Sequence, residues 1–162
     1  MDQPDYHATL CRYFEEEIEG EGYFLELADQ SSGDEAAKLR LLAAVEREAA
    51  NAVAPLLDRH GLVPRSDAEL LASGRRQAQK ALPLDWPAFI DDMERRYPDY
   101  MPAFALLERL GPEADQPALR RLTEHEVEVI DFAGRERAGD PASTAPLLRY
   151  LAGPAGGSAE VV

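Results

Sequence analysis

Cysteine, basic residues and long apolar runs are all scarce in this sequence of 162 residues. The single cysteine, Cys11, excludes an intramolecular disulfide and any Cys-x-x-Cys motif, and it is typical of a reducing compartment. Only 17 Lys and Arg accompany 31 Asp and Glu, so the net charge of −14 argues against binding to nucleic acid or to anionic membranes. No apolar run approaches the roughly 18 residues of a membrane span. Since the first residues also show no secretory signal, we expect a cytoplasmic protein that binds no membrane and no nucleic acid.

Strand patterns and the common catalytic motifs are missing as well. No segment alternates apolar and polar residues as a half-buried strand does. There is no Gly-x-Gly-x-x-Gly or Walker loop to hold phosphates, and no nucleophile elbow around a serine. What is present is a helical period, in segments rich in Ala, Leu, Glu and Arg. The sequence therefore predicts an all-α protein.

Turn and capping residues divide the chain into four long predicted helices. The second opens at a capping box formed by Ser32 and Glu35, and the third opens at Asp85. We expect Pro98 and Pro102 to kink the third helix. The predicted helices cover about residues 5–29, 33–60, 86–110 and 116–138.

The connections between these helices differ in length. Short loops join the first helix to the second and the third to the fourth, whereas the segment 62–86 is long and carries a weak capping box at Ser66 and Glu69. Two antiparallel hairpins joined by one long crossover, here with a short helix, are a known variant of the four-helix bundle. We expect a single domain over residues 1–151, ending in a short helix at 145–151, and a flexible tail over 152–162.

Carboxylates interrupt the apolar stripes of three predicted helices. Glu21, Glu46 and Glu126 each take a mid-height position where an apolar residue should face the core. His125 lies on the edge of the same stripe as Glu126, while the third helix is aromatic and offers only Glu94 near its inward face. A buried carboxylate must be neutralised, hydrogen-bonded or given a cation. A metal ion held by these oxygen and imidazole ligands is the simplest explanation.

Other interpretations of the same acids stay open. A stripe assignment that is wrong by about one residue would place them on the surface, in i,i+4 pairs with arginines. An acidic core satisfied by Arg or Tyr without metal is a second possibility, and His125 would then be a hydrogen-bonded core histidine. A third is an acid–base enzyme in which crowding raises the pKa of a carboxyl group toward neutrality.

The motifs around these acids resemble the ferritin-like superfamily, in particular rubrerythrin-like and related bacterial ferritin-like domain proteins. The similar segments are EGEGYFLELA at 19–28, LAAVERE at 42–48 and HEVEVIDFA at 125–133, continuing to Glu136. The resemblance implies a ferritin-like four-helix bundle. It also implies a site for two irons, built from a Glu on each of two helices and a Glu-x-x-His pair on each of the other two.

Position by position, the match to that di-iron site is incomplete. The resemblance assigns Glu21, Glu46 and Glu126 to three of its glutamates, and Glu94 is the nearest candidate for the fourth. Both histidines are missing, because Ala49 follows Glu46 at the third position and Val129 follows Glu126 in the same way. His125 remains as the available imidazole.

The expected function is that of a ferritin-like metal-binding protein with an iron- or manganese-dependent oxidase or peroxide-handling activity. Its cofactor would be one iron, a di-iron pair or manganese, and its small-molecule substrate is unknown. The chain has no rubredoxin-like set of cysteines, which form the electron-transfer module of rubrerythrin. We therefore do not expect the activity of rubrerythrin itself. The alternative is a metal-free, homodimeric helical bundle that acts as an interaction or stress-associated protein.

Overall fold

The chain is all-α, as the sequence predicts. The computed structural model describes residues 5–154, and no strand occurs within this range. None of the helices in this part of the chain combines the length and apolarity needed to cross a membrane. Residues 155–162 of the predicted tail, and residues 1–4 of the predicted domain, lie outside the described residues.

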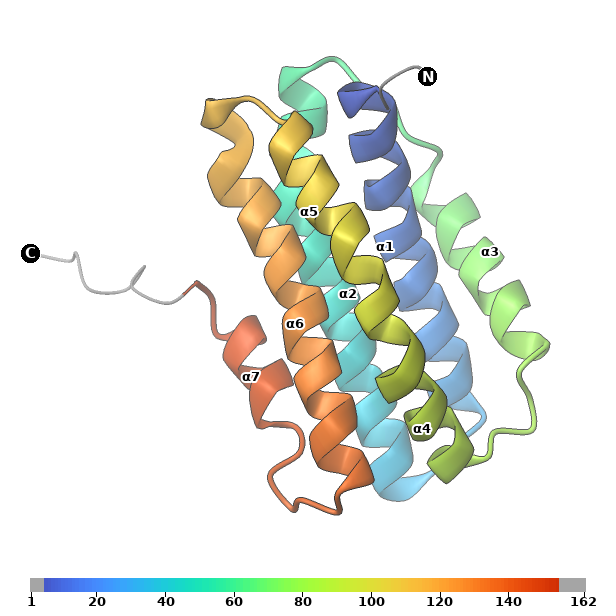
Figure 1. Ribbon diagram of the computed structural model, residues 1–162. Coiled ribbons are helices and arrows are strands. Elements are labelled where there is room, and N and C mark those ends of the chain that lie inside the picture. Colours follow the sequence, from blue (N-terminus) through green and yellow to red (C-terminus); the bar gives the residue numbers. More distant parts are fainter. Residues whose placement is uncertain (1–4, 155–162) are drawn as a thin grey trace, which may run out of the picture.

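Four helical columns lie side by side with their long axes aligned (Figure 1). They are formed by α1, α2, α6 and the continuous unit of α4, η1 and α5, while α3 lies along the outer side of α1 and α7 lies against α6. The helices are α1 (Tyr6–Asp29), α2 (Gly33–Arg59), α3 (Asp67–Gln79), α4 (Trp86–Arg96), the 3₁₀ helix η1 (Tyr97–Tyr100), α5 (Met101–Leu110), the 3₁₀ helix η2 (Glu113–Asp115), α6 (Gln116–Arg137) and α7 (Ala145–Leu151).

Side-chain caps begin several of these helices. The side chain of Ser66 accepts a hydrogen bond from the amide of Glu69 at the start of α3, and Asp85 accepts one from the amide of Ala88 at the start of α4. Both caps confirm the sequence-based prediction, because they satisfy amides that have no partner within the helix. Ser32 occupies the N-cap position of α2 as predicted, but its side chain makes no capping hydrogen bond.

Two prolines divide the third predicted helix. Pro98 lies in η1, and Pro102 lies in the first turn of α5. Proline has no amide hydrogen and its ring clashes with the carbonyl one turn earlier, so the column tightens into a 3₁₀ turn between α4 and α5. The predicted kink is confirmed at this point.

Glycines set the rotation of α1 about its axis. A Cβ atom at Gly22 would lie 2.3 Å from the carbonyl oxygen of Leu71, and one at Gly74 would lie 1.9 Å from that of Glu19. The backbones of α1 and α3 can approach this closely only because both positions are glycine. The face of α1 opposite Gly22, which carries Glu17, is thereby directed into the interior.

Two apolar clusters fill the interior, one toward each end of the columns. Between them, at mid-height, each column contributes a polar or aromatic side chain instead of an aliphatic one. One cluster is built around Leu10, Val53, Leu107 and Leu119, and the other around Phe24, Leu42, Met93 and Phe132.

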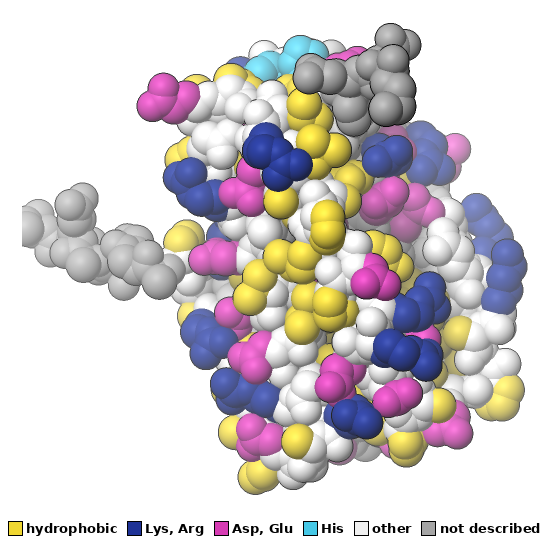
Figure 2. Space-filling view, viewed as in Figure 1, with side chains coloured by type: hydrophobic (Ala, Val, Ile, Leu, Met, Phe, Trp, Pro, Cys, Tyr) yellow, Lys and Arg dark blue, Asp and Glu magenta, His cyan; other side chains and the backbone are white. Residues whose placement is uncertain are grey.

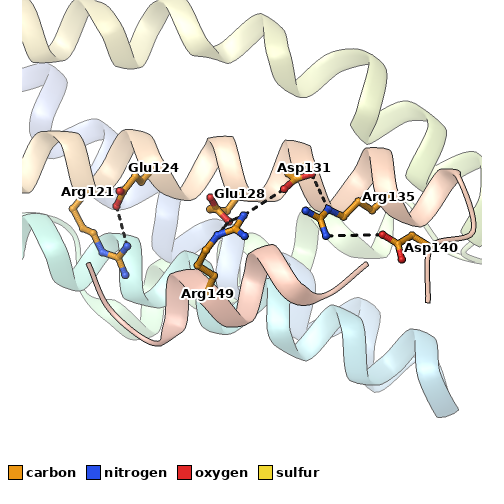
Figure 3. A network of polar contacts seen from close by, with 7 residues as sticks. All are labelled: Arg121, Glu124, Glu128, Asp131, Arg135, Asp140 and Arg149. Carbon is orange, nitrogen blue, oxygen red and sulfur yellow. Dashed lines mark hydrogen bonds and ion pairs between the residues drawn. The ribbon is translucent and has the colours of Figure 1, made fainter. Parts of the chain in front are cut away.

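Acidic and basic side chains are intermixed on the surface, and hydrophobic side chains gather along the middle of the face formed by α5 (Figure 2). On another side, α7 is tied to α6 by ion pairs (Figure 3). Arg149 lies 2.7 Å from Glu128 and 3.4 Å from Asp131, and Asp131 also pairs with Arg135 at 3.0 Å. These contacts hold α7 against the helix that carries His125.

Candidate functional site

Four buried side chains converge at mid-height, between the two apolar clusters. Glu17 comes from α1, Glu46 from α2, and His125 and Glu126 come from α6. Nε2 of His125 lies 3.0 Å from Oε2 of Glu17, 3.6 Å from Oε2 of Glu126 and 3.7 Å from Oε2 of Glu46. Three carboxyl groups thus surround Nε2 of a single imidazole.

The backbone hydrogen bond of His125 determines which ring nitrogen faces these acids. Nδ1 contacts the carbonyl oxygen of Leu122, one turn earlier in α6. A carbonyl oxygen can only accept, so Nδ1 carries a hydrogen and Nε2 is the ring nitrogen that faces the cluster. The edge-on ring of Phe104 and the ring of Tyr150 hold the imidazole in place, with centroids 5.6 and 6.3 Å away. Histidines that bind metals are commonly oriented by such a hydrogen bond on the other nitrogen.

Gly20 leaves room for the carboxyl group of Glu46. A Cβ atom at this position would lie 3.0 Å from Oε2 of Glu46 and 3.2 Å from its carboxyl carbon. A side chain at this position would therefore require the carboxyl group of Glu46 to shift by a few tenths of an ångström.

Two oxygens of the cluster are buried without a hydrogen-bond partner. They are Oε2 of Glu17, which is close to the imidazole but makes no hydrogen bond to it, and Oε1 of Glu126. Buried polar atoms are almost always satisfied, and an exception indicates a missing partner or a functional group. A cation bound beside the imidazole would supply a partner for the Glu17 oxygen.

Burial changes the protonation of all three acids. It raises the pKa of Glu17 to about 8 and that of Glu126 to about 7, and it raises the pKa of Glu46 well above its usual value. After burial, a hydrogen bond with Glu46 lowers the pKa of Glu17 and raises that of Glu46. His125 lowers the pKa of Glu46 and Glu126, while the charge of a neighbouring carboxylate raises the pKa of each acid. Without a cation the cluster therefore retains protons near neutral pH, and a metal ion would displace them.

Glu17, Glu46 and His125 could hold a metal ion. Each offers one ligand atom, and these atoms lie within 4.8 Å of one another. The three side chains come from three different helices, so the tertiary structure and not a local motif assembles the set. Oxygen and imidazole nitrogen are ligands that suit several divalent transition metals.

A cavity of about 790 Å³ connects this cluster to solvent. Its inner end is formed by the four clustered side chains, and exposed residues such as Arg12 and Arg96 line its mouth. Between floor and mouth the walls are largely aromatic. The rings on these walls belong to Tyr13, Tyr23, Phe89, Tyr97, Tyr100 and Phe104.

The structure brings together three of the five residues predicted as metal ligands, namely Glu46, Glu126 and His125. Glu21 lies elsewhere, with its Oε2 2.6 Å from Nε of Arg47 on the side of α1 that faces α2. The rotation of α1 imposed by Gly22 accounts for this difference.

Glu94 also lies outside the cluster. Its Oε2 is 3.5 Å from Nε of Arg137, near the far end of α6. On α4 and η1 the positions that face the cavity are taken by Met93 and Tyr97, so this column contributes no carboxylate to the cluster. The prediction that Glu94 points inward depended on a register that the structure does not have.

Glu17 is the residue that the sequence-based prediction missed. It belongs to an inward stripe of Leu10, Tyr13, Gly20 and Phe24, spaced alternately by three and four residues. That spacing is visible in the sequence. The competing stripe through Phe14 and Ile18 is also apolar, and it packs against Leu70 of α3.

Among the residues that the structure describes, Glu17, Glu46 and His125 are the only set of three or more His, Cys, Asp or Glu side chains close enough to share an ion. The chemistry of the chain must be inferred from this set, since a helical fold is compatible with many functions. Comparisons with protein-family models, with characterised proteins and with solved structures found no match to this chain.

Proposed function

We propose that this chain is a metalloprotein that holds one iron or manganese ion between Glu17, Glu46 and His125. The observation that carries the proposal is the convergence of these buried side chains from three helices, with an unpartnered carboxyl oxygen on Glu17. When bound, such an ion supplies one-electron redox chemistry toward dioxygen or peroxide. The proposed activity is therefore that of an oxidase or a peroxide-handling enzyme.

The proposed architecture is a ferritin-like four-helix bundle. Its two hairpins would be α1 with α2, and the α4–α5 column with α6, and α3 would lie in the long crossover. The short loops within each hairpin and the aligned columns support this assignment (Figure 1). So does the mid-height position of the cluster, because bundles of this kind place metal ligands on facing helices.

The donor set favours one ion over two. A di-iron site of the ferritin-like kind would require histidines where Ala49 and Val129 stand, and both residues are fully buried in apolar clusters. The remaining donors are carboxyl oxygens and a single imidazole, without sulfur. Iron and manganese accept such hard and borderline ligands.

Glu126 provides a group that can move a proton beside this ion. Glu126 lines the inner end of the cavity, its Oε1 has no hydrogen-bond partner, and its pKa of about 7 is matched to proton transfer near neutral pH. This oxygen is itself buried from solvent.

Metal analysis of protein purified without chelators tests the proposal. We expect close to one iron or manganese per chain, and a loss of most of it in the variants Glu46→Gln and His125→Gln. Glu21→Gln is the matched control, because Glu21 is a half-buried glutamate that pairs with Arg47 and lies outside the cluster. Wild-type protein that is metal-free, and that binds neither added ferrous nor manganous ion, would overturn the proposal.

A metal-free, homodimeric helical bundle with an interaction role is the second candidate. It is favoured by the raised pKa values of the three acids, which allow the cluster to be neutralised by its own protons. This candidate predicts that Glu46→Leu leaves the free energy of unfolding equal or higher, since apolar volume replaces a buried polar group. It also predicts a dimer in sedimentation analysis, with the exposed Val127 and Leu148 as candidate contacts.

A further inference from the structure

The cavity is much larger than a metal site needs. Its volume of about 790 Å³ lies within the range of roughly 300–1,000 Å³ that is typical of small-molecule pockets. An ion with a few water molecules, each taking about 30 Å³ in the liquid, would occupy only a small part of this volume. The space above the cluster therefore fits an organic molecule.

The walls of the cavity favour a molecule with an apolar or aromatic body. Tyr13, Tyr97 and Phe104 lie near the cluster, and Tyr23 and Tyr100 lie farther out. Aromatic side chains bury apolar surface, and their faces also attract cations through the negative potential of the ring.

The charge of the cavity excludes anions and favours a cation. At its mouth, Glu16 lies 3.7 Å from Arg12 and Asp92 lies 3.2 Å from Arg96, so these charges largely cancel. At its floor, Glu17, Glu46 and Glu126 have no arginine or lysine partner. A divalent ion bound by Glu17 and Glu46 would neutralise these two acids. Glu126 would then remain as a free acidic group at the inner end of the cavity, behind its aromatic walls.

We propose that the cavity binds a small organic ammonium with an aromatic or apolar body, whose N–H group donates a hydrogen bond to the carboxyl group of Glu126. This inference rests on the proposed function, in which the ion takes Glu17, Glu46 and His125 and leaves Glu126 free. Glu126 is 5 % exposed, lines the cavity and has no hydrogen-bond partner on Oε1. A buried acceptor of this kind orients a ligand and discriminates against one that lacks the N–H group.

Three probes of similar shape and different charge test the inference. They are 2-phenylethylamine, 2-phenylethanol and 3-phenylpropanoate, each titrated calorimetrically into protein purified with its metal. We expect the amine to bind at least about tenfold more tightly than the alcohol, and the carboxylate to bind most weakly. Equal affinity for the amine and the alcohol, or a preference for the carboxylate, would overturn the inference without any variant.

The variant Glu126→Gln identifies the anchoring residue. It should keep its metal and bind the amine about tenfold more weakly, at the level of the alcohol. Glu21→Gln should change neither property. Loss of metal in Glu126→Gln would make Glu126 a ligand of the ion and would refute the assignment. If wild-type protein holds no metal but still prefers the amine through Glu126, the proposed function fails and the ammonium site remains.

Discussion

The acids of α1 differ in what neutralises them. Glu15 and Glu19 pair with Arg65, and Glu21 pairs with Arg47. Glu17 has no such partner and lies 3.0 Å from the imidazole of His125. Since an unpaired buried charge is very costly, Glu17 must either keep a proton or face a cation. Proton and metal therefore compete for the same oxygen.

Metal-free protein should lose stability as the pH rises from about 5 to about 8. The pKa of Glu17 is raised to about 8 by burial, whereas an unfolded chain has a glutamate pKa of about 4.3. Between these values the folded state binds more protons than the unfolded state, so the free energy of unfolding falls with rising pH. Glu17→Gln should flatten this slope and add on the order of 2 kcal/mol of stability at the alkaline end.

Urea unfolding of chelator-treated protein across this pH range measures the effect. The control is Glu35→Gln, which removes a charge from the exposed first turn of α2 and should keep the wild-type slope. An unchanged slope in Glu17→Gln would mean that Glu17 does not hold the proton in the folded state.

At the scale of helices, α1 shows why the inward residue was misassigned. One apolar stripe of α1, with Phe14 and Ile18, packs against α3, and another, with Tyr13 and Phe24, faces the interior. A helix with two apolar stripes is covered on two sides, and its periodicity alone cannot distinguish them. The packing of α3 decides that Glu17 faces the interior.

Gly74→Ala should destabilise the protein by at least about 2 kcal/mol. The added Cβ atom would lie 1.9 Å from a backbone carbonyl of α1, and neither backbone can move without separating α3 from α1. Gly134→Ala is the matched control, because it is also a glycine within a helix but its Cβ atom would have no neighbour within 4 Å. That control should be neutral or more stable by about 0.5–1 kcal/mol, and thermal unfolding of both variants compares them. Equal melting temperatures would contradict the close approach of the two helices.

Across the whole molecule, one buried carboxylate joins segments that are far apart in the sequence. Asp115, just before α6, accepts a hydrogen bond from the hydroxyl of Tyr6 at 2.6 Å and contacts Arg59 and the ring of His60. It thereby links the start of α1 and the end of α2 to the start of α6. This end of the molecule lies beyond one apolar cluster and away from Glu17, Glu46 and His125.

Asp115→Ala should cost on the order of 2 kcal/mol, because three polar partners lose a shared acceptor. Burial tends to raise the pKa of Asp115, but the hydrogen bonds from Tyr6 and His60 and the charge of Arg59 hold it below the usual value. The contribution of this carboxylate is therefore present above the usual aspartate pKa of about 3.9 and disappears as the pH falls through the lowered value. The stability difference between wild type and Asp115→Ala should accordingly shrink below about pH 4, as measured by denaturant unfolding. A difference that stays constant into the acid range would contradict this role.

The sequence by itself determined the helices and most of their ends. Helical periodicity, the caps at Ser66 and Asp85 and the kink at Pro98 are local properties, which depend on residues within one turn of each other. Three of the four clustered residues could also be recognised, because Glu46, His125 and Glu126 interrupt or border a single apolar stripe.

Only the tertiary structure decided which acid of α1 joins them. The choice of Glu17 over Glu21 follows from the rotation that Gly22 and Gly74 allow against α3. The carboxyl and imidazole groups come from three helices, and burial by all of them together raises the pKa values of the acids. The sequence contains the acids and the histidine, and folding brings Glu17, Glu46 and His125 to one point from three helices.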